Sequence, residues 1–296
     1  MNSLPTRAFG ATGLQVTALG FGAMHLNDAR VSEDDAGRLL NEVLDLGVNL
    51  IDTARGYGLS EERIGRHIAH RRSDYVLSTK VGYGIPGVPD WTYACIMAGV
   101  DAALVRMRCE VLDIVHLHSC PQDVLERGEV ITALEDCARA GKLRVAAYSG
   151  DNEALDWAIA CGRFAGVQTS ISLCDQQSIP QRLGVMQARG IGVIAKRPVA
   201  GSVWRSTTRP DGHCESHYWD RWQAMGLDPQ GLDWNELALR FTAFLPGVAS
   251  CIVGTSRLAH FRQNMAMLTQ GPLKPSLQQQ IEQAFLQHDE HWVGMT

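Results

Sequence analysis

The sequence lacks long apolar runs, paired cysteines and a basic patch, and each absence excludes a class of protein. No apolar run approaches the roughly 20 residues of a transmembrane helix, and the first residues lack the hydrophobic stretch of a signal peptide. The eight cysteines are scattered without short paired spacings, which is typical of reduced thiols rather than of a disulfide framework. The formal net charge of -5 is spread along the chain and favours neither nucleic acid nor an anionic membrane as a partner. We therefore expect a cytoplasmic protein that acts on a small molecule, and no feature of the sequence indicates an oligomeric state.

Metal-ligating side chains gather in one short segment. His213, Cys214, Glu215 and His217 are suitable ligand types, but a zinc site needs four well-placed ligands and no second cluster completes the set. A polar loop without a metal is therefore the favoured interpretation. The sequence also lacks a G-x-G-x-x-G loop after its first strand run, so the common dinucleotide-binding motif of Rossmann folds is absent.

Short β-rich runs alternate with helical patterns along most of the chain. A hairpin around Ala11-Thr12-Gly13 comes first, and the alternation follows it. The strand runs cover residues 16–21, 49–51, 75–79, 114–117, 144–148, 167–170, 192–195 and 250–253, and the helical patterns cover residues 32–46, 60–70, 92–107, 130–140, 153–161, 179–188, 234–244 and 258–268. Repeated βα units indicate a parallel sheet, and eight of them in about 250 residues suit a (β/α)8 TIM barrel with its active site at the carboxyl ends of the strands. The sequence therefore predicts one α/β barrel domain over residues 1–296.

The segment from residue 201 to residue 233 is the one irregular stretch. It follows the seventh strand run, so it lies on the catalytic face of the predicted barrel. Loops of this length are usually functional lids or disordered segments. We expect a lid or a cofactor clasp.

Four ionisable side chains follow successive strand runs. Asp52 ends the second run, Tyr57 lies five residues later in a glycine-flanked loop, and Lys80 and His118 end the third and fourth runs. Taken singly, such an Asp is more often a helix cap, such a Lys a surface charge and such a His a hydrogen-bonded core group. Their coincidence at one end of three successive strands favours a common acid-base site. His116 shares a strand face with His118 one layer deeper, which favours a buried core role.

The chemistry of these groups suits proton transfer. A free tyrosine has a pKa of about 10 and is a weak proton donor or base near neutrality. A lysine ammonium held against a phenol stabilises the ionised phenol, and a carboxylate paired with the lysine keeps the ammonium charged and in place. Tyr57, Lys80 and Asp52 suit these roles. His118 can hydrogen-bond a substrate oxygen and orient it.

The spacing of Asp52-Thr53-Ala54, Tyr57-Gly58 and Ser60-Glu61 closely resembles the signature of the aldo-keto reductase family, and Lys80 and His118 stand where that family has its catalytic Lys and His. The resemblance covers nearly the whole chain. It implies NAD(P)H-dependent reduction of an aldehyde, ketone or sugar carbonyl, with Tyr57 as the general acid. Two alternatives stay open. The protein could be a sugar (aldose) dehydrogenase that uses the same site, or a non-catalytic regulatory subunit that only binds the cofactor.

The resemblance also implies a cofactor site. The expected cofactor-binding residues are Gly22, Ala23, Met24, Asp52, Ser149, Gln168, Lys196, Arg197, Pro198, Gly201, Gly254, Thr255, Ser256, Arg257, His260, Gln263 and Asn264. In such a site Gln168 and Ser149 hold the nicotinamide carboxamide, and Gln263 and Asn264 read the adenine. NADP is favoured over NAD because Arg257 offers a planar cation for a 2'-phosphate at an open helix N-terminus, although His260 stands where the family usually has a basic residue.

Two positions depart from the family pattern. Gly150 stands where the family usually has Asn, so one amide contact is missing or comes from Asp151 or Asn152. Lys196 stands where an aromatic side chain usually stacks on the nicotinamide ring. Either its methylene stem covers the ring, or Arg197 points toward the pyrophosphate, or the two form a basic pair on the surface.

The sequence leaves the substrate open. The side chains of Met24, Tyr83, Trp91 and Trp204 follow strand runs and are candidates for the wall of the substrate pocket. An aromatic residue in a loop is as often a packing residue as a substrate contact. The set suits sugars and aromatic aldehydes alike.

Overall fold

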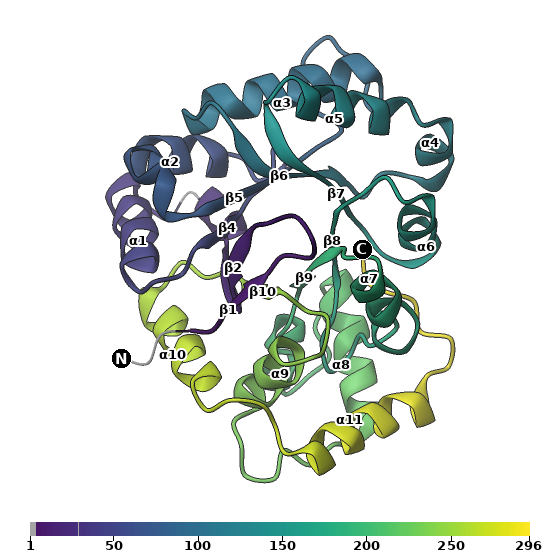
Figure 1. Cartoon of the computed structure of the whole chain (residues 1–296). Coiled ribbons are helices and arrows are strands. Elements are labelled where there is room, and N and C mark those ends of the chain that lie inside the picture. The colour runs from purple at the N-terminus through teal and green to yellow at the C-terminus, as the bar shows by residue number, and fades with distance from the viewer. Residues whose placement is uncertain (1–3, 29) are drawn as a thin grey trace.

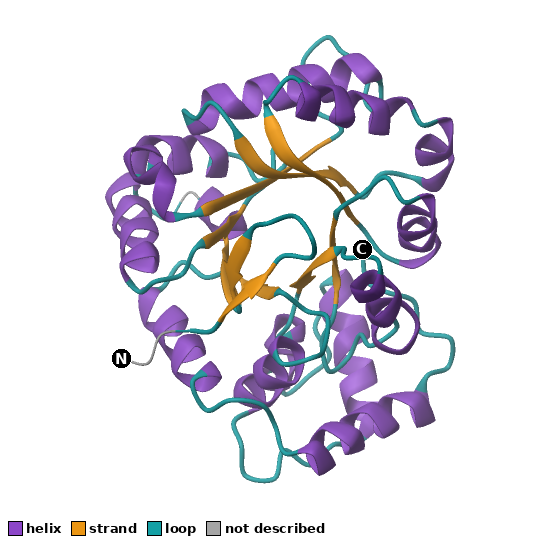
Figure 2. Cartoon of the chain, viewed as in Figure 1, coloured by secondary structure: helices purple, strands orange, loops and turns teal. Residues whose placement is uncertain are grey.

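Eight parallel strands form a closed barrel in the computed structural model, which describes residues 4–28 and 30–296. The strands are β3 (Leu19–Gly22), β4 (Leu50–Asp52), β5 (Val76–Val81), β6 (Leu112–His118), β7 (Leu143–Ser149), β8 (Gly166–Ser170), β9 (Gly192–Lys196) and β10 (Ser250–Val253). Strand β10 closes the ring by pairing with both β9 and β3. Figure 1 shows this ring inside a layer of helices, and Figure 2 shows the same layers by element type. The predicted (β/α)8 TIM barrel is therefore confirmed.

Helices cover the outside of the barrel. The helices that follow barrel strands are α1 (Glu33–Asp45), α2 (Ser60–His67), α3 (Tyr93–Met107), α5 (Glu129–Arg139), α6 (Asn152–Cys161), α7 (Gly184–Ala188), α9 (Trp234–Ala243) and α10 (Leu258–Leu268). In α1 the Ser32 side chain caps the N-terminus by accepting a hydrogen bond from the Asp35 amide, and one face buries Leu40 and Val43. Such apolar faces cover the outer side of a parallel sheet, which must be buried on both sides.

Shorter and additional helices complete the structure. They are η1 (Ala23–Asn27), η2 (Ala69–Asp74), α4 (Gln122–Arg127), η3 (Ile179–Leu183), η4 (Ala200–Arg205), α8 (His213–Met225) and α11 (Pro275–His288). Helix α8 packs against both η4 and α11. These three helices form a group beside the ends of β8 and β9, in the lower right of Figure 1.

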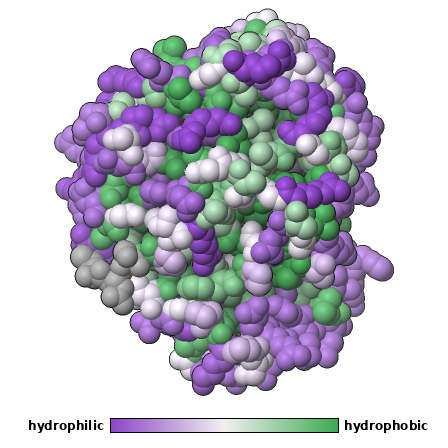
Figure 3. Space-filling view, in the orientation of Figure 1, coloured by the Kyte–Doolittle hydropathy of each residue, from purple (hydrophilic) through white to green (hydrophobic). Residues whose placement is uncertain are grey.

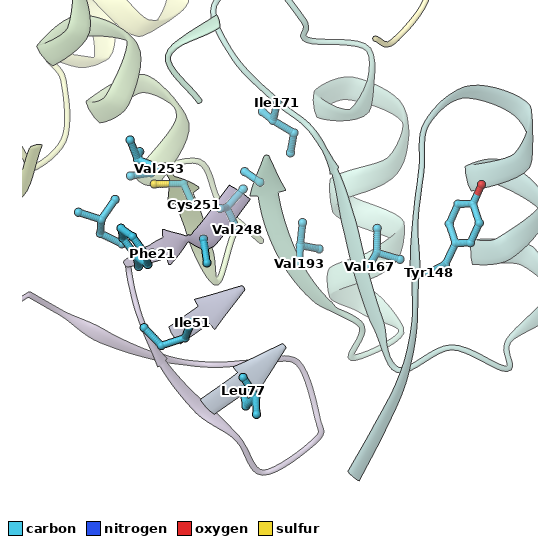
Figure 4. Close-up of a cluster of buried hydrophobic side chains, with 14 of the residues drawn as sticks. Phe21, Ile51, Leu77, Tyr148, Val167, Ile171, Val193, Val248, Cys251 and Val253 are labelled. Atoms are coloured by element: carbon cyan, nitrogen blue, oxygen red, sulfur yellow. The ribbon is translucent and has the colours of Figure 1, made fainter. Parts of the chain in front are cut away.

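Alternation along the strands points one set of side chains outward under the helices and the other into the barrel, where apolar residues such as Leu50 fill the amino end. Ile51, Leu77 and Val167 belong to the large apolar cluster between strands and helices (Figure 4). Successive side chains of a strand point to opposite faces, so Asp52 and Gln168, the next residues after Ile51 and Val167, point into the barrel. In each of these strands, an apolar residue that points outward therefore lies next to a polar residue that points into the barrel.

The N-terminal hairpin closes one end of the barrel. Strands β1 (Thr6–Ala8) and β2 (Gln15–Thr17) pair antiparallel, and the hairpin lies across the centre of the ring in Figure 1. Phe9 at its tip is fully buried and packs with Leu50 and Val76, which begin their strands. A Cβ at Gly192 would lie 2.5 Å from the Phe9 ring, so this strand needs glycine there. The hairpin thus covers the amino end of the barrel, opposite the carboxyl ends of the strands.

The prediction of one continuous strand over residues 16–21 is wrong. The structure divides this segment between β2 of the hairpin and β3 of the barrel. The division occurs at Ala18, where the Thr17 hydroxyl donates a 2.8 Å hydrogen bond to the carbonyl of Leu19. Both halves are apolar and β-rich, so the sequence pattern alone does not reveal the change of partner strand.

The segment from 201 to 233 is less irregular than the sequence indicates. It contains most of η4 and the whole of α8, so the interpretation of residues 213–217 as a polar loop is wrong. Helix α8 is rich in polar residues yet buries Tyr218, Arg221 and Met225. Helices α4 and α11 were not predicted either. The apolar positions of α11, Leu277, Ile281 and Phe285, show helical spacing, but the helix lies beyond the last βα unit.

Polar and apolar side chains share the face of the molecule drawn in Figure 3. Within residues 4–28 and 30–296, no helix is both long enough and apolar enough to cross a bilayer.

Candidate active site

A buried ion pair joins the ends of β4 and β5. Lys80 Nζ lies 2.6 Å from Asp52 Oδ2, and each residue is only 1% exposed. The ammonium also donates to the Thr53 carbonyl at 2.9 Å. The second carboxylate oxygen, Oδ1, accepts hydrogen bonds from Ser78 Oγ at 2.8 Å and Gln168 Nε2 at 2.9 Å. Both charges are therefore hydrogen-bonded inside the barrel.

The ion pair keeps Lys80 charged beside Tyr57. Burial lowers the pKa of Lys80, but the Asp52 carboxylate more than offsets it, and the pKa lies above its ordinary value. Lys80 Nζ is 5.0 Å from the centre of the Tyr57 ring. A positive charge is thus held against the phenol at neutral pH, as the sequence predicts for a proton-donating tyrosine.

His118 lies between two tyrosines. Its ring meets the Tyr57 ring edge-on at a centroid distance of 5.9 Å and stacks on the Tyr83 ring at 5.5 Å. Burial and the nearby charges of Lys80 and Lys196 lower the pKa of His118 to about 3. His118 is therefore neutral at physiological pH and has one N–H to donate.

His116 has the core role that the sequence predicts. It is fully buried one layer below His118, and its Nε2 lies 3.1 Å from Ser78 Oγ. The Ser78 hydroxyl also donates to Asp52, and His116 Nδ1 faces the Tyr148 carbonyl at 3.4 Å. Burial lowers the pKa of His116 to about 4. It supports the ion pair through Ser78.

A cleft of about 520 Å³ opens beside these groups at the carboxyl end of the barrel. The predicted residues that line it are Gly22, Met24, Asp52, Tyr57, Gln168, Lys196, Arg197, Pro198, Gly201 and Gly254. Sequence reasoning missed other lining residues, which are His25, Val199, Ser202, Cys214, Glu215, Tyr218, Ile252 and Val253. Several of them lie on α8, within residues 201–233. The length of this segment and its position after a barrel strand were the signals for a lid.

Two of the residues that line this cleft, Gly22 and Gly254, are glycines. Gly22 ends β3, and Gly254 follows the neighbouring strand β10. A Cβ at Gly254 would lie 2.8 Å from the His25 ring and 2.9 Å from the Gly22 carbonyl oxygen. A side chain there would force its neighbours to shift, and glycine lets a ligand approach the backbone closely.

The basic pair after β9 is not on the surface. Lys196 Nζ lies 2.9 Å from Asp151 Oδ2, and its side chain is 14% exposed. Lys196 lines the cleft, and Asp151 holds its ammonium. The Arg197 guanidinium donates to Ser170 Oγ at 3.0 Å and to the carbonyl of Met295. The surface alternative is therefore wrong.

The structure explains why Asn is missing after Ser149. A Cβ at Gly150 would lie 2.4 Å from the Tyr148 hydroxyl, so a side chain there needs a rearrangement. Asp151 and Asn152, the two residues expected to replace that Asn, already have other partners. Asp151 bonds Lys196 and the amide of Ser170, and Asn152 forms two hydrogen bonds with the backbone of Gly294. Ser149 itself donates to Gln168 Oε1 at 3.3 Å.

The residues expected to bind the adenosine half lie at the start of α10, in a second depression. Ser256 and Arg257 line it together with Arg30, Arg38 and other residues of the α1 side. Arg257 is exposed, and the hydrogen bonds of the described residues include none from its guanidinium. Predicted contacts with Ala23, Thr255, His260, Gln263 and Asn264 stay predictions.

The substrate candidates divide into two groups. Met24 is 52% exposed and lines the cleft, while Tyr83 lies beside His118 and Trp91 packs on Tyr83. Trp204 stacks on Trp234 and donates to Asn235 Oδ1 at 3.0 Å. This packing against α9 accounts for Trp204 without a substrate. In the described part of the chain, no group of three or more His, Cys, Asp and Glu side chains is arranged to hold a metal.

We predict that Lys80→Met destabilises the protein by about 3 to 5 kcal/mol, because it leaves Asp52 buried without its counter-ion. Lys142→Met is the matched control. Lys142 bonds Asp101, and their side chains are 31% and 53% exposed, so its loss costs less than about 1 kcal/mol. Urea unfolding measures both free energies. Equal losses in the two variants contradict the prediction.

Asp175 gives a prediction for pH. Its carboxylate is buried and accepts hydrogen bonds from the Met295 amide and the Tyr218 hydroxyl. Burial, with the nearby charge of Asp151, raises its pKa to about 7, whereas an unfolded Asp titrates near about 3.9. The folded protein therefore binds the extra proton, and this group lowers the free energy of unfolding as pH rises from about 4 to 7.

Asp175→Asn removes this titration. We expect the variant to match wild type near pH 4 and to gain on the order of a few kcal/mol relative to it by pH 8. Urea unfolding across this range measures the difference. A difference that stays constant with pH contradicts the assignment of this raised pKa.

Comparisons with known proteins agree with this geometry. The model of the Aldo/keto reductase family matches residues 18–285. An aldo-keto reductase from Bacillus halodurans, solved in its holo form, has a TM-score of 0.84 and 27% identity, with 95% of this chain and 96% of that chain covered. L-galactose dehydrogenase of Arabidopsis thaliana is 28% identical over 91% of this chain and 90% of its own length. D-threo-aldose 1-dehydrogenase of a Pseudomonas species is 25% identical over 87% of this chain and 91% of its own length.

The family model and the structural neighbours each span most of the chain. Aldo-keto reductases use nicotinamide cofactors, and the glycines that line the cleft let a ligand approach the backbone closely. The protein belongs to the aldo/keto reductase family and is an NAD(P)H-dependent oxidoreductase.

Proposed function

We propose that the protein is an NADP-dependent reductase that converts an aldehyde, ketone or sugar carbonyl to an alcohol, with Tyr57 as the general acid. The observation that carries this proposal is the arrangement around the buried Asp52–Lys80 pair. Lys80 holds its charge 5.0 Å from the centre of the Tyr57 ring, and neutral His118 meets that ring edge-on at a centroid distance of 5.9 Å. All of these groups lie at the open end of the barrel.

Each residue has a distinct role in this reaction. Lys80 stabilises the Tyr57 phenolate that remains after the proton has moved to the substrate oxygen, and Asp52 keeps Lys80 charged and in place. His118 donates its single N–H to the same oxygen and orients the carbonyl. Because its pKa is lowered to about 3, His118 acts as a neutral hydrogen-bond donor rather than as an acid. When bound, the reduced nicotinamide supplies the hydride.

The cofactor lies along the cleft in this proposal. Gln168 and Ser149 hold the carboxamide, and the stem of Lys196 covers the ring where an aromatic residue is usual. The N-terminus of α8, through Glu215 and Tyr218, forms the clasp over the middle of the cleft. Arg257 at the start of α10 binds the 2'-phosphate, which favours NADP.

A sugar (aldose) dehydrogenase at the same site is the second candidate. Two relatives are sugar or aldose dehydrogenases by name, and both match over most of their length. The same groups serve oxidation, with the Tyr57 phenolate as the base. A panel of aldehydes and free sugars, assayed by nicotinamide absorbance in both directions, distinguishes the two. A non-catalytic regulatory subunit is disfavoured because all four ionisable groups are present and arranged for catalysis.

Tyr57→Phe tests the proposal directly. Only one oxygen is lost from a half-buried side chain, so we expect fold and cofactor affinity to persist while turnover falls about 100-fold or more. Thermal unfolding and cofactor fluorescence titration provide the controls. A variant that retains more than about a tenth of wild-type turnover contradicts the role of Tyr57.

Arg257→Ala tests the choice of cofactor. Two charge-assisted hydrogen bonds to the 2'-phosphate are worth about 1.5 to 3 kcal/mol, so NADPH affinity falls by about one to two decades while NADH affinity changes little. Fluorescence titration with both cofactors measures the effect. Arg262→Ala is the matched control, because Arg262 lies on the same helix and its guanidinium bonds Glu42. Parallel losses for the two cofactors, or a wild type that prefers NADH, overturn the NADP assignment.

A further inference from the structure

Tyr83 is a second phenol in the catalytic site, next to His118. Its hydroxyl lies 2.7 Å from His118 Nδ1, which is the separation of a hydrogen bond. The two rings are also stacked at an interplanar angle of 23°. Tyr83 therefore contacts the catalytic histidine both by its face and by its hydroxyl.

The backbone around Tyr83 is arranged to hold it there. The Trp91 ring packs on Tyr83 at a centroid distance of 5.8 Å, and the Trp91 amide donates to the Gly82 carbonyl at 2.8 Å. Gly82 has a φ of 144°, and a Cβ there would lie 2.1 Å from the Trp91 ring. A Cβ at Gly56 would lie 3.0 Å from the Tyr83 hydroxyl. Tight packing on several sides thus fixes both the ring and the hydroxyl.

The charge states of the two groups leave two directions for this hydrogen bond, and one of them keeps an N–H for the substrate. Burial lowers the pKa of His118 to about 3 and, together with the charge of Tyr57, raises that of Tyr83. Both groups are neutral, so the imidazole has one N–H and the phenol keeps its proton. If the imidazole proton were on Nδ1, it would point to Tyr83, and Nε2 would present a lone pair to a substrate oxygen. If Tyr83 donates, the proton stays on Nε2 and is available to the substrate.

We propose that Tyr83 is a positioning residue that donates its hydroxyl proton to His118 Nδ1 and so holds His118 in the tautomer whose Nε2–H binds the substrate carbonyl oxygen. This inference rests on the proposed function, because it assumes that His118 contacts the substrate oxygen. It differs from the expectation that Tyr83 is part of the substrate wall, since Tyr83 acts here through His118.

Kinetics of Tyr83→Phe test the proposal. The change removes only the hydroxyl, and one net hydrogen bond is worth about a three- to tenfold effect, so kcat falls by that factor while KM for a small aldehyde changes less than about twofold. Tyr93→Phe is the matched control. The Tyr93 hydroxyl donates to Asp136 on the outer helices, away from the site, and its loss leaves both constants unchanged. A rise in KM without a fall in kcat makes Tyr83 a substrate contact and overturns the proposal.

A double-mutant cycle distinguishes an effect of Tyr83 that acts through His118 from a direct effect of Tyr83 on the reaction. In a His118→Ala background, Tyr83→Phe is expected to change kcat by less than about twofold, because its partner is already gone. The same loss in both backgrounds overturns the proposal. Thermal unfolding of each variant verifies that the fold persists.

Nitrogen-15 NMR spectra of protein labelled at its histidines identify the tautomer of His118 without any enzymatic turnover. The His118 signals are assigned by their loss in His118→Ala. We expect a pure Nε2–H tautomer in wild type and a shift toward the Nδ1–H form in Tyr83→Phe. An Nδ1–H tautomer in wild type, or spectra identical in the two proteins, overturns the proposal. Because this measurement needs no substrate, its failure is distinct from a failure of the proposed reaction, which Tyr57→Phe tests.

Discussion

The Asp52–Lys80 ion pair is the interaction on which the rest of the site depends. Placing two charges inside a barrel costs several kcal/mol of desolvation per ion, and a separation of 2.6 Å offsets it only if the remaining hydrogen-bonding groups are satisfied. Ser78, Gln168 and the Thr53 carbonyl satisfy them. The pair therefore links β4, β5 and β8, and it holds a positive charge against Tyr57.

The pair is possible because each strand of the barrel has two different faces. Outward side chains such as Ile51 and Val167 pack under the helices, and the inward side chains next to them carry the polar chemistry. The hairpin fills the amino end with Phe9, opposite the carboxyl ends of the strands. One end of the interior is therefore a packed core and the other is a reaction site.

Contacts between distant segments form the cofactor face. Arg197, which follows β9, has a left-handed backbone with φ of 56° and is held by the carbonyl of Met295 near the end of the chain. Asp151 bonds Lys196 and also the amide of Ser170. These links join the C-terminal residues to the ends of β8 and β9 beside the cleft.

The sequence by itself determined the barrel and the four ionisable groups, because both depend on local patterns. The alternation of strand and helix is periodic, and Asp52, Tyr57, Lys80 and His118 sit at fixed distances from strand ends. The sequence did not determine where the first run divides, that residues 213–225 form a helix, or that the charge of Lys196 is directed to Asp151. It also did not reveal that the Tyr83 hydroxyl meets His118. Only the tertiary structure decided these features, since each depends on partners far away in the sequence: β1 for the hairpin, η4 and α11 for α8, Asp151 for Lys196, and β6 for Tyr83.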